Sequence, residues 1–190
     1  GGVANLLAEP RVAVVASLLL PCLGLPLGLL LQVLALRLTP RVQPGCYAAG
    51  SGADLQIALR SEALEQAMAW LSGSLFWPPW LRLAGMRIGP GAEVSSIIDV
   101  LPETVSIGEE SFFADGVYFC QPRRLPGRVL VAETRLGPGS FLGNHALVRA
   151  GLDYPAGFFL GVSTVAGPQQ AAEGGDWFGH PPFRLPRREQ

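Results

Sequence analysis

Residues 130–165 read LVAETRLGPGSFLGNHALVRAGLDYPAGFFLGVSTV, and their spacing decides the fold. Every sixth position holds a large apolar residue: Leu130, Leu136, Leu142, Val148, Tyr154 and Leu160. A small or β-branched residue stands four positions after many of them, and glycine often follows directly. A helix has a period of 3.6 residues and a strand a period of two, so neither produces this spacing. The spacing is that of a hexapeptide repeat.

The repeat extends upstream to residue 88, with one slip of register. Its apolar positions there are Ile88, Val94, Val100, Ile107, Phe113 and Phe119. In a β-helix the large residue points into a narrow prism, and glycine permits the backbone angles of the corners. Three hexapeptides make one triangular coil, so residues 87–168 predict a parallel β-helix of about four coils. Residues 120–129 break the repeat and predict a projecting loop, either a substrate-binding insertion or a solvated loop without a role.

Residues 12–36 carry no charge over 25 consecutive positions. A bilayer core takes roughly 20 apolar residues, so residues 1–41 predict a transmembrane or re-entrant segment. A signal peptide and a buried soluble helix are the alternatives. Arg37 and Arg41 follow the apolar run, and the positive-inside tendency places the β-helix in the cytoplasm.

Residues 42–86 are expected to form a helical connector. Apolar and polar side chains alternate at helical spacing between Asp54 and Leu71, with Arg60 on the polar side, which predicts an amphipathic helix. The aromatic stretch 76–80 predicts either a membrane-surface contact or a plug for one end of the β-helix. Residues 169–190, rich in proline and aromatic side chains, are expected to pack on the β-helix as a C-terminal tail.

Composition excludes two classes of function. The formal net charge is −1 and only 15% of residues are charged, which argues against a nucleic-acid partner because phosphate recognition needs a concentrated basic surface. Three scattered cysteines and two histidines cannot supply the three-histidine zinc site of β-helical carbonic anhydrases. The sequence therefore predicts no metal site.

Three stretches carry a resemblance to a known family: FLGNHALV (141–148), LGVSTV (160–165) and DWFGHPPFRLPRRE (176–189). The chain resembles one of the repeated C-terminal modules of the Pls/PosA-type non-ribosomal peptide synthetases, the group that includes ε-poly-lysine synthetase. In that family, adenylation and carrier domains precede membrane segments that alternate with soluble domains similar to hexapeptide acyltransferases. The resemblance implies a left-handed β-helix in a protein of the bacterial inner membrane.

The activity that the resemblance implies is amide-bond formation between a carrier-bound aminoacyl thioester and the amine of an amino acid. The thioester would be presented on the phosphopantetheine arm of an aminoacyl carrier domain outside this chain. The expected partners are that carrier domain, the amine acceptor, membrane lipid, and sister modules or a trimeric assembly. The alternatives are a non-catalytic scaffold module of such a synthetase and a free-standing acyltransferase that uses coenzyme A.

His145 is the candidate general base, because an imidazole accepts a proton near neutrality and the hexapeptide register puts it near a corner. Asn144 is expected to orient a substrate carbonyl, and His180 to bring a second histidine to the site. The alternative for His145 is a corner histidine satisfied by neighbouring backbone.

Two further sets of residues are weaker candidates. Asp115 and Glu103, on other coils, are expected to orient a histidine or bind an ammonium group. Trp177 is a candidate for substrate binding or an apolar anchor of the tail. The arginines of the 120–129 stretch are expected to contact the phosphate of the phosphopantetheine arm or an acidic carrier surface; they are Arg123, Arg124 and Arg128. Catalysis within one module predicts that His145 and these arginines line one cleft.

Overall fold

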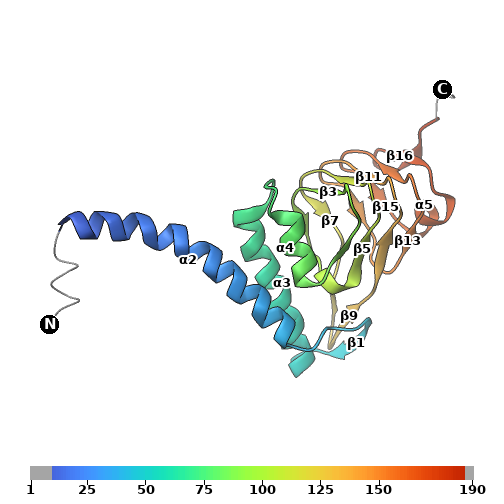
Figure 1. Ribbon diagram of the computed structural model, residues 1–190. Helices are drawn as coiled ribbons and strands as arrows, with labels where there is room; N and C mark the ends of the chain where they lie inside the picture. The colour runs from blue at the N-terminus through green and yellow to red at the C-terminus, as the bar shows by residue number, and fades with distance from the viewer. Residues whose placement is uncertain (1–9, 187–190) are drawn as a thin grey trace. The chain divides into compact units, whose positions relative to one another are not determined.

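The computed structural model in Figure 1 describes residues 10–186, in two compact units that comprise residues 1–39 and 40–190. The described part of the first unit is mainly the long helix α2 (Pro10–Leu38), which contains Pro21 and Pro26. Within residues 10–186, the stretch Val12–Leu38 is the one helix long and apolar enough to cross a membrane. None of its most apolar window is buried, unlike the core helix of a soluble protein. Length and composition therefore fit a membrane span or a signal sequence.

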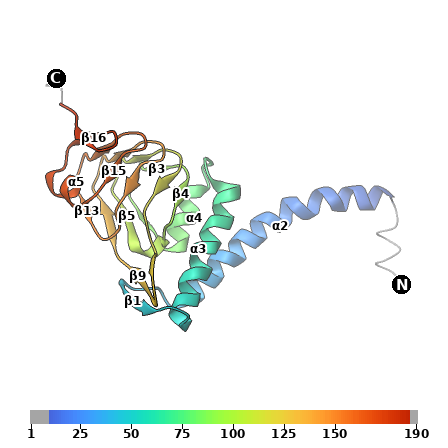
Figure 2. The ribbon, with the colours of Figure 1, turned by 180° about the vertical axis from the view of Figure 1, so that it is seen from behind.

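The second unit is built on a parallel β-helix with three faces, and the strands of successive coils pair in parallel on each face (Figure 2). The first face holds β2 (Arg87–Ile88), β5 (Val105–Ile107), β10 (Thr134–Leu136) and β13 (Asp153–Tyr154). The second holds β3 (Glu93–Val94), β6 (Phe112–Phe113), β11 (Phe141–Leu142), β14 (Phe159–Leu160) and β16 (Asp176–Phe178). The third holds β4 (Ile97–Ile98), β7 (Val117–Tyr118), β12 (Leu147–Val148) and β15 (Val165–Ala166). The predicted β-helix is confirmed: four complete coils are followed by β16, which begins a fifth.

The interior of the prism is filled by residues that the hexapeptide period assigns to it. On the second face, Val94, Phe113, Leu142 and Leu160 are all buried. They are direct neighbours across successive strand pairs, so each inward side chain rests on that of the preceding coil. Leu130 is the exception, because it lies half-buried in a strand outside the prism.

Residues 123–131 form a β-hairpin where the sequence predicts a loop. Its strands are β8 (Arg123–Leu125) and β9 (Arg128–Val131), and β1 (Gly45–Ala48) pairs antiparallel with β9. A small separate core lies beneath this sheet and consists of Val42, Ile57, Leu101, Val129 and Val131. The loop prediction was wrong because these strands are stabilised by pairing with β1, which is distant in sequence.

The helix expected between Asp54 and Leu71 is α3 (Gly52–Leu71), and the Ser51 Oγ accepts a hydrogen bond from the Asp54 N–H at its start. Its faces differ from the prediction. Arg60, expected on the polar face, is buried, whereas Leu55 and Leu59 are exposed. The reason is a buried ion pair between Arg60 and Glu103, which draws the guanidinium inward.

Helix α4 (Trp77–Ala84) plugs the N-terminal end of the prism and packs near the short 3-10 helix η1 (Pro102–Thr104). Trp77 and Trp80 are buried and stack with a centroid distance of 5.6 Å. The Trp77 Nε1–H donates to the Ser95 carbonyl at 2.6 Å, which joins the plug to the first coil. Of the two readings of the aromatic stretch, the structure shows the plug for these tryptophans, while Phe76 is exposed.

The other end of the prism is covered by α5 (Pro168–Glu173) and by β17 (Phe183–Arg184), which pairs antiparallel with β16. Trp177 is buried, and its Nε1–H donates to the Gly174 carbonyl at 3.0 Å. The tail therefore packs on the last coil, with Trp177 as its anchor. Residues 1–9 and 187–190, at the ends of the predicted membrane segment and tail, lie outside the described residues.

Substitution of Gly108 tests how closely the coils stack. A Cβ added to it would lie 2.3 Å from the backbone nitrogen of Pro138 in the next coil. We expect Gly108→Ala to lower the free energy of unfolding by about 1–3 kcal/mol, because backbone cannot move aside as a flexible side chain can. Gly52→Ala, at the open start of α3, is the control and should be neutral or slightly stabilising. Thermal unfolding measures both, and equal stabilities would contradict the close stacking.

Candidate functional site

The candidate site is the corner between the second and third faces, here called the second corner. The pairings Phe113–Leu142 and Leu142–Leu160 align Gly116, His145 and Ser163 on consecutive coils. All three have left-handed backbone, with φ of 67°, 56° and 52°. Glycine adopts this conformation without strain, whereas histidine does so less readily. The repeating turn therefore imposes the backbone conformation at His145.

Hydrogen bonds link the coils at the second corner. The His145 N–H donates to the Asp115 carbonyl at 2.8 Å, and the Asp115 N–H donates to the Asn144 Oδ1 at 3.1 Å. The Ser163 N–H donates to the Asn144 carbonyl at 2.9 Å. The Asn144 side-chain oxygen is thus engaged within the corner. Its NH2 group is the part that suits the predicted contact with a substrate carbonyl.

The imidazole of His145 lies against Gly116 of the preceding coil. A Cβ added to Gly116 would approach the His145 Nδ1 to 2.5 Å. Glycine at this position therefore makes the space that the ring occupies. Both His145 and Asn144 are exposed, so the imidazole is accessible to a substrate.

Asp115 belongs to the same corner and is held by a residue that sequence reasoning missed. The Ser95 Oγ of the first coil donates to the Asp115 Oδ1. Because the Ser95 carbonyl also accepts from Trp77, the chain of contacts runs from the plug helix through Ser95 to Asp115. Coils are about 4.8 Å apart, so Ser95, Asp115 and His145 form a polar strip along three successive coils. The strand pairings align Ser95 with Ala114 and Asp115 with Asn144, so each residue of the strip is one position further along its coil than the last, and only the pairing between coils identifies the strip.

His180 is not joined to His145 by any hydrogen bond or ion pair within the described residues. The pairing of Leu160 with Trp177 makes its position equivalent to that of Ser163, two coils or about 10 Å beyond His145. After Gly179, whose N–H donates to the Thr164 Oγ1 at 2.9 Å, the chain turns into β17. His180 is therefore exposed near the end of the same corner, without direct contact with His145.

A groove of about 560 Å³ lies beside the second corner, between α4 and the first two coils of the second face. Leu75, Pro78, Pro79 and Phe112 supply apolar walls, Arg82 and Glu93 supply charge, and Ser95 lines the groove at the corner. Outside the prism, the Phe112 ring stacks on Phe141 at 5.5 Å, and Phe141 stacks on Phe159 at 4.9 Å. An apolar strip thus runs from the groove along the second face.

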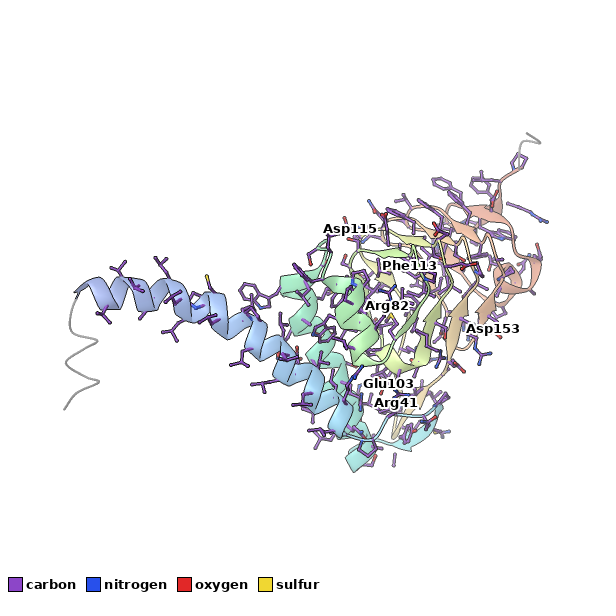
Figure 3. The ribbon with its side chains drawn as sticks, in the orientation of Figure 1. Arg41, Arg82, Glu103, Phe113, Asp115 and Asp153 are labelled. Atoms are coloured by element: carbon purple, nitrogen blue, oxygen red, sulfur yellow. The ribbon has the colours of Figure 1, made fainter. Side chains whose placement is uncertain are left out.

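Glu103 and Trp177, two candidates for substrate binding, have structural roles. The Glu103 Oε1 lies 3.2 Å from the Arg60 Nη1 and accepts from the Val42 N–H at 3.1 Å, and both side chains are 3% exposed. In Figure 3, Glu103 and Asp115 lie far apart. The prediction that Glu103 contacts substrate was wrong, because the residue neutralises a buried arginine. Trp177 anchors the tail.

The three arginines lie on the hairpin that leaves the prism after the third face. All three arginines are exposed, and the Arg124 Nη1 lies 2.6 Å from the Asp54 Oδ1. The Gly50 N–H bound to the Asp54 carboxylate, and then Arg124, lower the pKa of Asp54. The hairpin and His145 belong to different corners, so this chain alone does not bring them into one cleft.

Cys120 is the only cysteine in the described β-helix and a possible nucleophile by residue type. Burial, and then the negative charge of Asp99, raise the pKa of its thiol. Because the thiolate is the reactive form, a raised pKa makes Cys120 a poor nucleophile at neutral pH.

The fold and the corner together define a hexapeptide-repeat β-helix module with an exposed histidine. Over 154 residues the chain is 32% identical to the Delta-poly-L-ornithine synthetase of Acinetobacter baumannii (strain AB307-0294), a match that covers 79% of this chain and 12% of that protein. The resemblance to Pls-type synthetases is thereby confirmed for this segment, which spans about an eighth of the relative's length.

Among solved structures, the chain is similar to a maltose O-acetyltransferase from Clostridium difficile 630, with 13% identity over 77% of this chain and 94% of that chain and a TM-score of 0.48. It is also similar to a truncated serine acetyltransferase apoenzyme, with 13% identity over 68% of this chain and 57% of that chain and a TM-score of 0.42. Both scores are below 0.5, so the likeness concerns general shape alone. No family model matches the chain.

Gly116 tests the placement of the His145 ring. We expect Gly116→Ala to displace the imidazole, because the new Cβ would meet the Nδ1 atom at 2.5 Å. Gly139→Ala is a matched control, since Gly139 has nearly the same backbone angle, φ +66°, and no atom within 4 Å of an added Cβ. NMR chemical shifts of the His145 ring should change only in Gly116→Ala. Equal changes in both variants would contradict the packing of the ring on Gly116.

Substitution of Glu103 tests whether this residue stabilises the fold through its ion pair with Arg60. We expect Glu103→Gln to lower the free energy of unfolding by about 3–5 kcal/mol, because Arg60 would keep its charge in a buried site without a counter-charge. Glu62→Gln removes the same charge from an exposed position on α3, the helix that carries Arg60, and should change stability little. Denaturant unfolding measures both. A stable Glu103→Gln variant with impaired substrate binding would restore Glu103 as a site residue.

Proposed function

We propose that this module catalyses the condensation step of a membrane-bound peptide synthetase, in which an aminoacyl thioester is passed to the amine of an amino acid. The observation that carries the proposal is the exposed His145 at the second corner, beside Asn144 and Asp115, in a segment homologous to a poly-ornithine synthetase. The name of that relative makes ornithine the first amino acid to test.

In the proposed reaction, His145 takes a proton from the attacking ammonium group, and the freed amine adds to the thioester carbonyl. The Asn144 NH2 group donates to the oxygen of the tetrahedral intermediate. This addition forms the C–N bond, and collapse of the tetrahedral intermediate breaks the C–S bond and expels a thiolate. His145 gives the proton it received to the thiolate, then takes the remaining extra proton from the new C–N nitrogen and releases it to solvent, which leaves a neutral amide. Asp115, one coil away, contributes negative charge that favours binding of the ammonium group.

The acyl donor in this proposal is carried on the phosphopantetheine arm of a carrier domain. Arg123 and Arg128 are exposed on the hairpin and suit an acidic carrier surface or the phosphate of the arm. Since they belong to another corner than His145, we assign them to docking of the carrier and not to the reacting carbonyl. Sister modules or a trimeric assembly would bring a hairpin of one prism near the second corner of another. A donor bound to coenzyme A is the corresponding proposal for a free-standing acyltransferase.

We further propose that α2 anchors the module in the bacterial inner membrane, in contact with lipid, with the β-helix in the cytoplasm. Its apolar length and the positions of Arg37 and Arg41 after the apolar run support this orientation. Activated aminoacyl groups are made with ATP, which is available on that side of the membrane.

A second candidate function is a non-catalytic scaffold module of the same synthetase. The separation of the arginine hairpin from His145 favours it, because one module then lacks a cleft lined by both. The two functions differ in whether His145 is needed for product formation.

The test is polymer formation by the full-length synthetase with ATP and ornithine, comparing wild type with His145→Gln. We expect a loss of about 10²–10⁴-fold, the usual contribution of general-base catalysis, with normal aminoacyl loading of the carrier. His180→Gln, measured in parallel, shows whether the second histidine takes part. Undiminished polymer in His145→Gln would contradict catalysis by this module and favour the scaffold.

A further inference from the structure

The groove beside the second corner has features of a small-molecule site that the condensation mechanism does not yet use. Its volume of about 560 Å³ lies in the range of ligand pockets. Most of its wall is apolar, from Leu75, Pro78 and Pro79 on the helical side and Phe112 on the prism. Ligand sites commonly combine such walls with a few polar groups that fix orientation.

The groove contains two opposite charges on different elements. Arg82 comes from α4, and Glu93 comes from β3. The Arg82 side chain donates from Nε to the Ile88 carbonyl at 3.1 Å and from Nη2 to the Gly89 carbonyl at 3.0 Å. These bonds hold the guanidinium in place and leave further N–H donors, since arginine has five.

Arg82 and Glu93 do not pair with each other. Among the ion pairs of the described residues, neither side chain has a carboxylate or guanidinium partner, and both residues are exposed. Each charge is thus available to a ligand group of opposite sign. A carboxylate suits the fixed guanidinium, and an ammonium group suits the glutamate.

We propose that this groove binds a free aliphatic amino acid that has a carboxylate at one end and an ammonium group at the other. Arg82 binds the carboxylate, Glu93 binds the terminal ammonium, and the methylene chain lies against Pro78, Pro79 and Phe112. A basic diamino acid has this chemistry. The assignment of the bound amino acid as the acceptor in condensation rests on the proposed function, and its position fits because Ser95 joins the groove to Asp115.

The experiment measures binding without turnover, by titration calorimetry on the 190-residue chain in detergent. The probes are L-ornithine, 5-aminopentanoate, L-norvaline, which lacks the terminal ammonium, and 1,4-diaminobutane, which lacks the carboxylate. We expect L-ornithine and 5-aminopentanoate to bind comparably, and the other two probes to bind at least about 10-fold more weakly, because each loses one charge-assisted contact.

Variants then assign each end of the ligand. Glu93→Gln should weaken L-ornithine and 1,4-diaminobutane by about 10-fold and leave L-norvaline unchanged. Arg82→Gln should weaken L-ornithine and L-norvaline and leave 1,4-diaminobutane unchanged. Glu109→Gln and Arg87→Gln make the same charge changes at exposed positions outside the groove and should leave all four affinities unchanged. Thermal unfolding of each variant checks that the first coil remains folded.

Two results would overturn the inference: no saturable binding of L-ornithine at concentrations on the order of 10 mM, which is weaker than typical substrate affinities, or binding that is insensitive to both groove variants. Either result is independent of the role of His145, because no product is formed in the assay. Conversely, specific binding in the groove together with full polymer formation by His145→Gln would leave the site standing and remove the proposed catalyst.

Discussion

The structure depends on the stacking of one coil directly on the next. The strands are only two or three residues long, and a strand of that length has no independent stability. Each is held by backbone bonds to the coils above and below and by the inward side chain of its neighbour, as at Phe113 and Leu142. Close approach at Gly108 and Gly137 allows that stacking. The placement of every outward residue, including His145, follows from the register that stacking sets.

Stacking also explains how much of the fold is readable from sequence. The six-residue period assigns Val94, Phe113 and Leu142 to the interior. Each coil needs a large apolar residue at the same place, and this regular spacing can be seen in the sequence alone. The β-hairpin was not predicted because its strands depend on β1, about 80 residues upstream in register. The burial of Arg60 was missed for the same reason, since its partner Glu103 belongs to another element.

In the candidate site, too, some features were predicted from the sequence and others were not. His145, Asn144 and Asp115 were predicted as residues of interest from their chemistry and their outward positions. Asp115 was expected to orient a histidine, but its place beside Asn144 could not be derived from the sixfold spacing, because an ordinary coil runs from residue 142 to residue 160, whereas the coil that contains the hairpin runs from residue 113 to residue 142. Ser95 and Gly116 are small residues without a chemical signature, and only the register between coils gives them a role. The groove depends on where α4 packs, which no local pattern states.

The covering of both ends of the prism has a consequence for assembly. An uncovered terminal coil would offer its unpaired strand edges to a second solenoid, and copies would then join end to end into a filament. Here α4, with Trp77 and Trp80, closes one end, and α5 with the antiparallel β17 covers the other. These covering elements disfavour growth along the axis and favour contacts between neighbouring prisms through their sides. In a lateral contact, a corner of one prism faces another prism. With both ends covered, a site shared by two modules would therefore lie between their side faces.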